Sequence, residues 1–146
     1  MHAPKWRTGA GVLTLLVWLA SCGPNNKTVE YPLIETANTN ALDIAKVELT
    51  DSATILHTDA YYRPHNWIRI SSESYLQAGG KRYMLTGAEG ITPDSLFWMP
   101  ESGEASFTLR FEPLPSGTPS FDFIESDCDD CFQIYGCLLY TSDAAD

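Results

Sequence analysis

Apolar residues in the centre of the chain recur in short alternating runs that predict β-strands. Residues 106–111 read Ser-Phe-Thr-Leu-Arg-Phe, and residues 121–123 read Phe-Asp-Phe. A period of two buries one face of a strand and leaves the other in water. Both segments are therefore expected to contribute one apolar face to a core.

Further strand-like runs follow one another at close intervals. Gly79-Gly80 is typical of a hairpin turn between two of them. Only Thr92–Phe97, with Pro93 at its start, suggests a turn of helix. Many short strands with Pro and Gly between them predict an all-β fold, an antiparallel β-sandwich with an immunoglobulin-like Greek-key arrangement. The remaining runs are Leu42–Leu49, Thr54–Tyr62, Trp67–Ile70, Tyr75–Gln77, Arg82–Leu85 and one that starts at Phe132.

The beginning of the chain has a different pattern, which predicts an export signal. Lys5 and Arg7 precede an apolar stretch over residues 12–20. That stretch is shorter than the roughly 20 residues that a membrane-spanning helix needs. It runs into Leu-Ala-Ser-Cys at residues 19–22, which resembles the lipobox of bacterial lipoprotein precursors. We therefore expect residues 1–21 to be a signal peptide, helical in its apolar part, and Cys22 to be the site of lipidation.

Residues 22–28 are polar and are expected to be a linker between the lipid and the folded domain. They lack the acidic run that marks surface export in many gut Bacteroidetes lipoproteins. The expected location is therefore the cell envelope, with the periplasmic side of the outer membrane favoured over the cell surface.

The last ten residues, 137–146, read Cys-Leu-Leu-Tyr-Thr-Ser-Asp-Ala-Ala-Asp. All of them match the translation of an adapter used in transposon-based DNA sequencing libraries. We interpret this segment as an artefact of the DNA sequence. The folded domain is then expected to span residues 29–136, with the strand that starts at Phe132 cut off after Gly136.

Charge narrows the range of functions. The chain has 19 Asp and Glu against 9 Lys and Arg, a formal net charge of −10. Phosphate binding needs basic residues to displace counterions, and no basic stripe is present. Nucleic acid is therefore excluded as a partner, and the length suits one domain with one core.

Cys128 and Cys131 flank two aspartates and are the one cysteine pair with the spacing of a redox or metal motif. In an oxidising compartment they could form a local disulfide, or they could stay free thiols in a solvated acidic turn. A redox role is disfavoured, because the acidic neighbours Glu125 and Asp127 oppose thiolate formation. Zinc would need a second Cys or His pair, and calcium a glycine with spaced carboxylates. We expect no metal and no cofactor.

Aromatic residues cluster at Tyr61, Tyr62, Trp67, Phe97 and Trp98. They could form a platform that binds a sugar or a peptide. Aromatic residues of a small sandwich belong to its core more often, because each buries a large area.

A hydrolase triad has little support in the sequence. The serine elbow Gly-x-Ser-x-Gly is absent. His57 lies in an alternating run and is expected to be a partnered residue on a strand face, and His65 is expected in a loop. We expect no catalytic residue in this chain.

Four segments together resemble a known family. Leu42–Leu49 and residues 63–70, 97–107 and 120–135 look like the N-terminal region of TlpA-like thiol-disulfide oxidoreductase lipoproteins of Bacteroides relatives. In that family the region precedes a thioredoxin-like domain with the catalytic cysteines. The resemblance implies a non-catalytic accessory domain that positions the catalytic domain or holds exported client proteins. No residue here matches a thioredoxin active-site motif, so the catalytic domain is expected beyond Gly136. The alternative is a stand-alone lipoprotein that binds a glycan or a peptide on its aromatic face.

Overall fold

The computed structural model describes residues 26–128 and 130–139, and over these residues it contains strands and turns but no helix. Within them, no segment meets the length and hydropathy that a membrane-spanning helix requires. The predicted signal helix and the predicted lipidation site Cys22 lie outside the described residues. The strands are β1 (Lys27–Glu30), β2 (Ile34–Ala37), β3 (Leu42–Leu49), β4 (Thr54–Tyr61), β5 (Trp67–Ile68), β6 (Tyr75–Ala78), β7 (Lys81–Glu89), β8 (Phe97–Trp98), β9 (Glu104–Phe111), β10 (Ser120–Ile124) and β11 (Gln133–Leu138).

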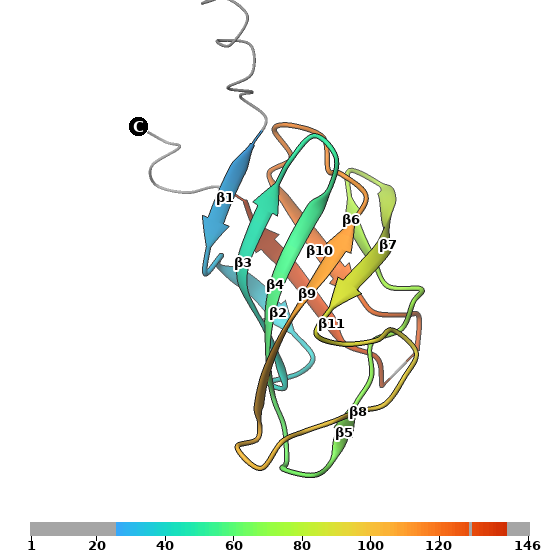
Figure 1. Cartoon of the computed structure of the whole chain (residues 1–146). Coiled ribbons are helices and arrows are strands. Elements are labelled where there is room, and N and C mark those ends of the chain that lie inside the picture. The colour runs from blue at the N-terminus through green and yellow to red at the C-terminus, as the bar shows by residue number, and fades with distance from the viewer. Residues whose placement is uncertain (1–25, 129, 140–146) are drawn as a thin grey trace, which may run out of the picture.

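Nine strands form one antiparallel sheet that curls into a sandwich (Figure 1), in the order β1-β3-β4-β9-β7-β6-β10-β11-β2. Within this order, β3-β4-β9-β7 corresponds to the A-B-E-D sheet of an immunoglobulin constant-type domain, and β6-β10-β11 corresponds to C-F-G. The long strand β7 joins the two layers, because Lys81–Met84 pairs with β6 and Leu85–Glu89 pairs with β9. The predicted all-β antiparallel sandwich with immunoglobulin-like order is confirmed.

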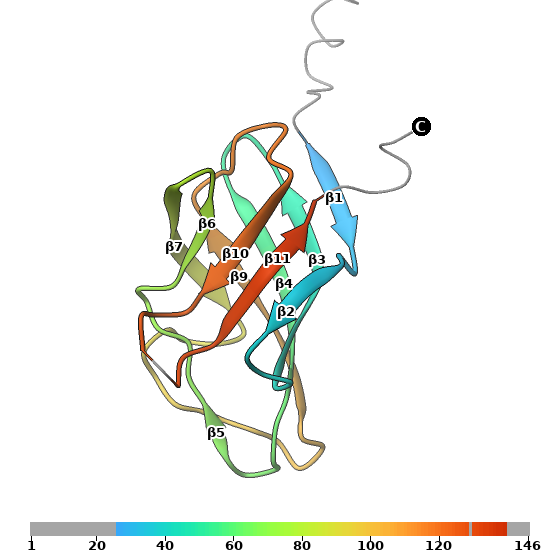
Figure 2. The ribbon, with the colours of Figure 1, turned by 180° about the vertical axis from the view of Figure 1, so that it is seen from behind.

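The ends of the curled sheet are β1, paired with β3, and β2, paired with β11. β1 begins at Lys27, so Lys27 and Thr28 are strand residues and not part of the linker expected over residues 22–28. The first and last described residues lie at one end of the sandwich, and β5 and β8 lie at the opposite end (Figures 1 and 2).

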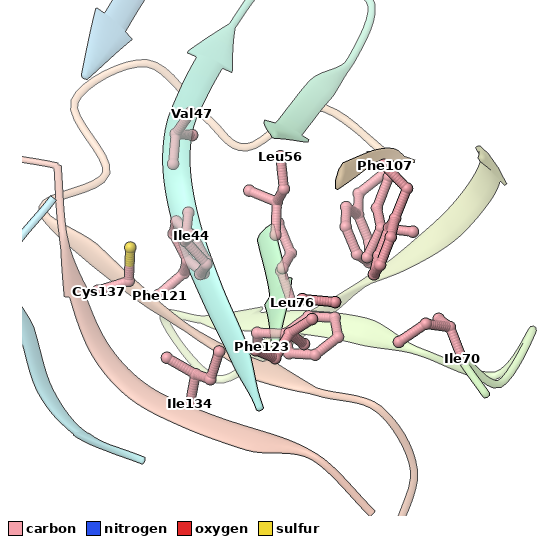
Figure 3. Packing of buried hydrophobic residues seen from close by; sticks show 14 of the residues in the cluster. Ile44, Val47, Leu56, Ile70, Leu76, Phe107, Phe121, Phe123, Ile134 and Cys137 are labelled. Atoms are coloured by element: carbon pink, nitrogen blue, oxygen red, sulfur yellow. The ribbon is translucent and has the colours of Figure 1, made fainter. Parts of the chain in front are cut away.

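The core lies between the two layers and is built from alternating positions. Phe107, Leu109 and Phe111 of β9 and Phe121 and Phe123 of β10 are all buried, as the period of two predicts. The rings of Phe111 and Phe123 pack edge to face with centroids 6.1 Å apart, a favourable geometry for aromatic pairs. Figure 3 shows the surrounding residues from both layers, among them Ile44, Leu56, Leu76 and Ile134.

Strand β11 continues past Gly136, the expected end of the domain, to Leu138. Cys137 pairs with Phe121 on β10, and Cys137 and Leu139 are fully buried. Burial raises the pKa of the Cys137 thiol to about 12. The strand therefore runs two residues beyond the boundary expected at Gly136, and Cys137 and Leu139 take part in the core. The adapter origin of residues 137–146 stays a prediction, and residues 140–146 lie outside the described residues.

Two predicted turns have different outcomes. Gly79 and Gly80 connect β6 to β7 with φ angles of 57° and 78°, which confirms the hairpin. The helical turn expected over Thr92–Phe97 is wrong. Asp94 adopts a φ of 69°, and Ser95 N donates to Thr92 O (3.1 Å) in a reverse turn. The left-handed backbone conformation of Asp94 is incompatible with a right-handed helical turn at this position.

Candidate ligand-binding cleft

Four aromatic side chains are exposed around the β5–β8 end of the sandwich. Trp67 and Trp98 are 47% and 60% exposed, and Tyr61 and Tyr62 are 44% and 41% exposed. The interpretation that these aromatic residues belong to the core is wrong for these four. It is right for Phe97, which packs against the core.

The two-stranded ribbon β5–β8 orients the tryptophans. Trp67 lies directly opposite Trp98, and Ile68 lies directly opposite Phe97. Neighbouring residues on a strand face opposite sides, and directly opposed residues share a face. The inner pair, Ile68 and Phe97, therefore contacts the core, and the tryptophan pair faces solvent.

Backbone hydrogen bonds hold this end of the molecule together. Met99 N donates to Asn66 O (2.7 Å), and His65 N donates to Met99 O (3.1 Å), which places His65 in a loop as predicted. Tyr62 N donates to Gly103 O (3.0 Å). Gly103 has a φ of 74°, and a Cβ there would lie 2.8 Å from Tyr62 O. Glycine is required at this position, because the close approach leaves no room for a side chain.

A cleft of about 490 Å³ opens beside the ribbon. Tyr62, Trp67 and Arg69 line one part of it, and the turn between β10 and β11 supplies Cys128 and Cys131. The volume lies in the range of small-molecule and side-chain binding pockets. The fold thus brings Tyr62 and Trp67 of the aromatic cluster beside the cysteine pair, two features that are separate in the sequence.

The cysteine pair forms a disulfide. The Cα atoms of Cys128 and Cys131 are 5.3 Å apart, within the normal range for a disulfide. Cys131 is buried, whereas Cys128 is exposed at the cleft. Of the alternatives left open by the sequence, the structure has the local disulfide in an acidic turn between two strands.

Glu125 anchors this turn from inside the protein. Glu125 is only 5% exposed. Its two carboxylate oxygens accept hydrogen bonds from Ser71 N and Phe132 N, each 3.0 Å long. The Glu125 carboxylate therefore links the chain after β5 to the start of β11. In the sequence, Glu125 stands out only as an acidic neighbour of the cysteines. Its partner Ser71 lies 54 residues away, so no local pattern marks the contact.

Asn38, after β2, holds the same turn from the other side. Its Nδ2 donates to Cys131 O (2.8 Å), and its Oδ1 accepts from Gln133 N (2.9 Å). The side-chain amide thus satisfies one backbone acceptor and one backbone donor at the disulfide. Sequence reasoning missed this residue too, since a single Asn in a loop carries no signal of its partner.

Carboxylates surround Tyr61 beside the cleft. Asp43 and Asp59 are directly opposite one another on β3 and β4, and Glu104 of β9 is directly opposite Tyr61. Asp59, followed by burial and the other two carboxylates, raises the pKa of Tyr61. Among the described residues, the side-chain ion pairs are His57–Glu48 and Arg82–Asp127, so the carboxylates around Tyr61 have no cationic partner there.

The two histidines of the described residues occupy separate parts of the fold, β4 for His57 and the loop before β5 for His65. His57 pairs with Glu48 across β3 and β4, which confirms its predicted role as a partnered face residue. Asp59 accepts a hydrogen bond from Ser106 Oγ (2.8 Å) and not from a histidine. Over residues 26–128 and 130–139, no group of His, Cys, Asp and Glu has the arrangement of a metal site.

Comparison with protein-family models, curated proteins and solved structures finds no match for the chain. The resemblance to the N-terminal region of TlpA-like oxidoreductases therefore stays a prediction.

Proposed function

We propose that the chain is a lipid-anchored, non-catalytic binding domain of the bacterial cell envelope that holds its ligand in the cleft beside Trp67. The exposed tryptophan pair carries this proposal. Tryptophan and tyrosine are enriched among the residues that dominate binding energy, because they bury a large rigid area and keep a polar group available. Trp67 and Trp98 are carried by a ribbon whose inner face is packed, so the backbone beneath them needs no further ordering when a ligand binds.

The position of the cleft agrees with attachment through Cys22. The first described residues lie at the end of the sandwich opposite β5 and β8 (Figure 1). A lipid on Cys22 would hold that end near the membrane and leave the aromatic end directed away from it. Replacement of Cys22 by Ser should move the protein from the membrane fraction to the soluble fraction and abolish incorporation of a labelled fatty acid. Unchanged labelling would refute the anchor.

In the wider proposal, the domain is the N-terminal accessory part of a thiol-disulfide oxidoreductase, and its ligand is an exported client protein. The resemblance of four segments supports this reading. The test is the uninterrupted reading frame beyond residue 136, which should continue into a thioredoxin-like domain with a Cys-x-x-Cys motif. A stop codon within a few positions would refute the oxidoreductase and leave a stand-alone binding lipoprotein.

Intrinsic fluorescence offers a direct test of binding. Cleavage before Cys22 removes Trp6 and Trp18, which leaves Trp67 and Trp98 as the remaining tryptophans. Any change in tryptophan emission therefore reports on the β5–β8 ribbon, whose Trp67 lines the cleft. The processed chain would be titrated with an unfolded polypeptide, reduced and carboxymethylated, and with soluble oligosaccharides such as cellohexaose.

A ligand that enters the cleft should shift or quench the emission. Trp67→Ala, read by anisotropy of a labelled ligand, should weaken its binding about tenfold or more, as for residues that dominate an interface. Met84→Ala is the matched control, because Met84 is 38% exposed on β7 and does not line the cleft. If neither ligand class changes the emission, or if Met84→Ala weakens binding equally, the site is wrong.

A further inference from the structure

We infer that the partner of this cleft is an extended, basic polypeptide that adds as a strand to the free edge of β2. The inference rests on the proposed function and names the class of partner. Three observations carry it: the free edge of β2, a groove that continues from that edge to the aromatic cleft, and the charge around the groove.

The first observation is the edge itself. Over residues 26–128 and 130–139, β2 is the last strand of the nine-stranded sheet, and three of its four residues are exposed. Asn38 N donates to Gln133 O, so Asn38 faces β11, and Ala37 before it turns its backbone N–H toward the open side. Within the strand there is neither Lys nor Pro, which commonly protect sheet edges from pairing. A polypeptide backbone offers N–H and C=O groups at the spacing that such an edge requires.

The second observation is a groove between β2 and β3. It measures about 310 Å³ and is lined by Ile34 and Ala37 on one strand and by Leu42 and Asp43 on the other. Tyr61 also lines this groove, whereas its neighbour Tyr62 lines the aromatic cleft, and Thr39 lines both. An extended segment paired with β2 would therefore continue into the cleft beside Trp67. A glycan would use the aromatic rings but not the strand edge.

The third observation, charge, selects a basic partner. Asp43 and Asp59 oppose one another directly, an arrangement that destabilises a sheet. Of these two, Asp43 lines the groove. Glu104 adds a third carboxylate on the next strand, and among the described residues no ion pair neutralises the three. Lysine or arginine side chains of a bound strand would supply the missing positive charge and could stack on Tyr61.

The test uses the full processed chain and fluorescein-labelled decapeptides, followed by fluorescence anisotropy. One peptide alternates Lys and Val, a second alternates Glu and Val, and a third is the Lys-Val peptide with alternate backbone nitrogens methylated. Only the first should bind at low salt, because the second has the wrong charge and the third cannot form strand hydrogen bonds. Methylation should weaken binding about tenfold or more, since it removes several backbone hydrogen bonds at once.

Two protein variants test separately how the edge of β2 and the negative charge of Asp43 contribute to peptide binding. Ala37→Pro removes the outward N–H and should weaken the Lys-Val peptide. Asp43→Asn should weaken it as well, whereas Asp51→Asn, the same charge change in the β3–β4 turn, should not. The methylated peptide needs no protein variant, so the edge stays testable even if Ala37→Pro fails to fold.

The outcomes distinguish this inference from the proposed function. If cellohexaose shifts the tryptophan emission and the Lys-Val peptide does not bind, the cleft is a glycan site and the polypeptide inference is overturned. If the methylated peptide binds as well as its parent, strand addition is overturned. If the peptides, the carboxymethylated polypeptide and the oligosaccharide all fail to bind, the proposed function fails together with it.

Discussion

Replacement of Glu125 tests how the two walls of the cleft are joined. Its carboxylate oxygens accept hydrogen bonds of 3.0 Å from the backbone N–H groups of Ser71 and Phe132. Glu125→Ala leaves both donors without this acceptor. A buried, unsatisfied donor costs about 1–3 kcal/mol, and both sites here are partly buried, so about 1 kcal/mol for each is appropriate. We therefore expect the free energy of unfolding to fall by about 2 kcal/mol.

Urea unfolding followed by circular dichroism measures this loss, and thermal unfolding should show a midpoint lower by about 8–12 °C. Glu125→Gln keeps one acceptor oxygen and should lie between the wild-type chain and Glu125→Ala. The matched control is Glu73→Ala, which removes the same charge from an exposed neighbour of Ser71 and should change stability by less than about 0.5 kcal/mol. If Glu125→Ala and Glu73→Ala have equal stability, the carboxylate does not hold the two segments together.

Other predictions test the remaining elements of the fold and the site. Serine in place of both cysteines of the Cys128–Cys131 disulfide removes a crosslink with a sequence separation of 3. The lost restriction of the unfolded chain should lower the free energy of unfolding by about 2 kcal/mol. An unchanged midpoint of urea unfolding would contradict this. Burial raises the pKa of Cys137 from 9.0 to about 12, so the unfolded chain loses this proton first as pH rises. Stability present below pH 9 should therefore fall toward pH 12, by about 1.4 kcal/mol between pH 8 and pH 10. Urea unfolding of Cys137→Ala should lack this component, and an identical pH dependence would refute it. Gly103→Ala should cost about 1–3 kcal/mol, because it strains a residue at a φ of 74° and forces a Cβ to 2.8 Å from Tyr62 O. Gly87→Ala, with nothing within 4 Å of its Cβ, is the control in thermal unfolding, and equal losses would show that the close approach is unimportant.

The strands and the fold class could be predicted from the sequence because their signals are local. Alternation over residues 106–111 reports which side chains share a face, whatever the rest of the chain does. The apolar run Leu42–Leu49 predicts a strand, and the structure has a strand with these bounds. Gly79-Gly80 predicts a hairpin because both residues can adopt positive φ without strain. The predicted export signal also rests on a local pattern of residues, which ends at Cys22.

Only the tertiary structure decided which aromatic residues face solvent. Each strand of the β5–β8 ribbon has two residues, both apolar, so no period can be read from Trp67-Ile68 or Phe97-Trp98. The register between β5 and β8, together with the packing of Ile68 and Phe97 against the core, turns the two tryptophans outward. The cleft likewise depends on contacts between distant segments, since Glu125 and Ser71 meet only after the two layers have closed. The local sequence thus determines which side chains share a strand face. Which of the two faces is buried depends on the distant segments that pack against the strand in the folded protein.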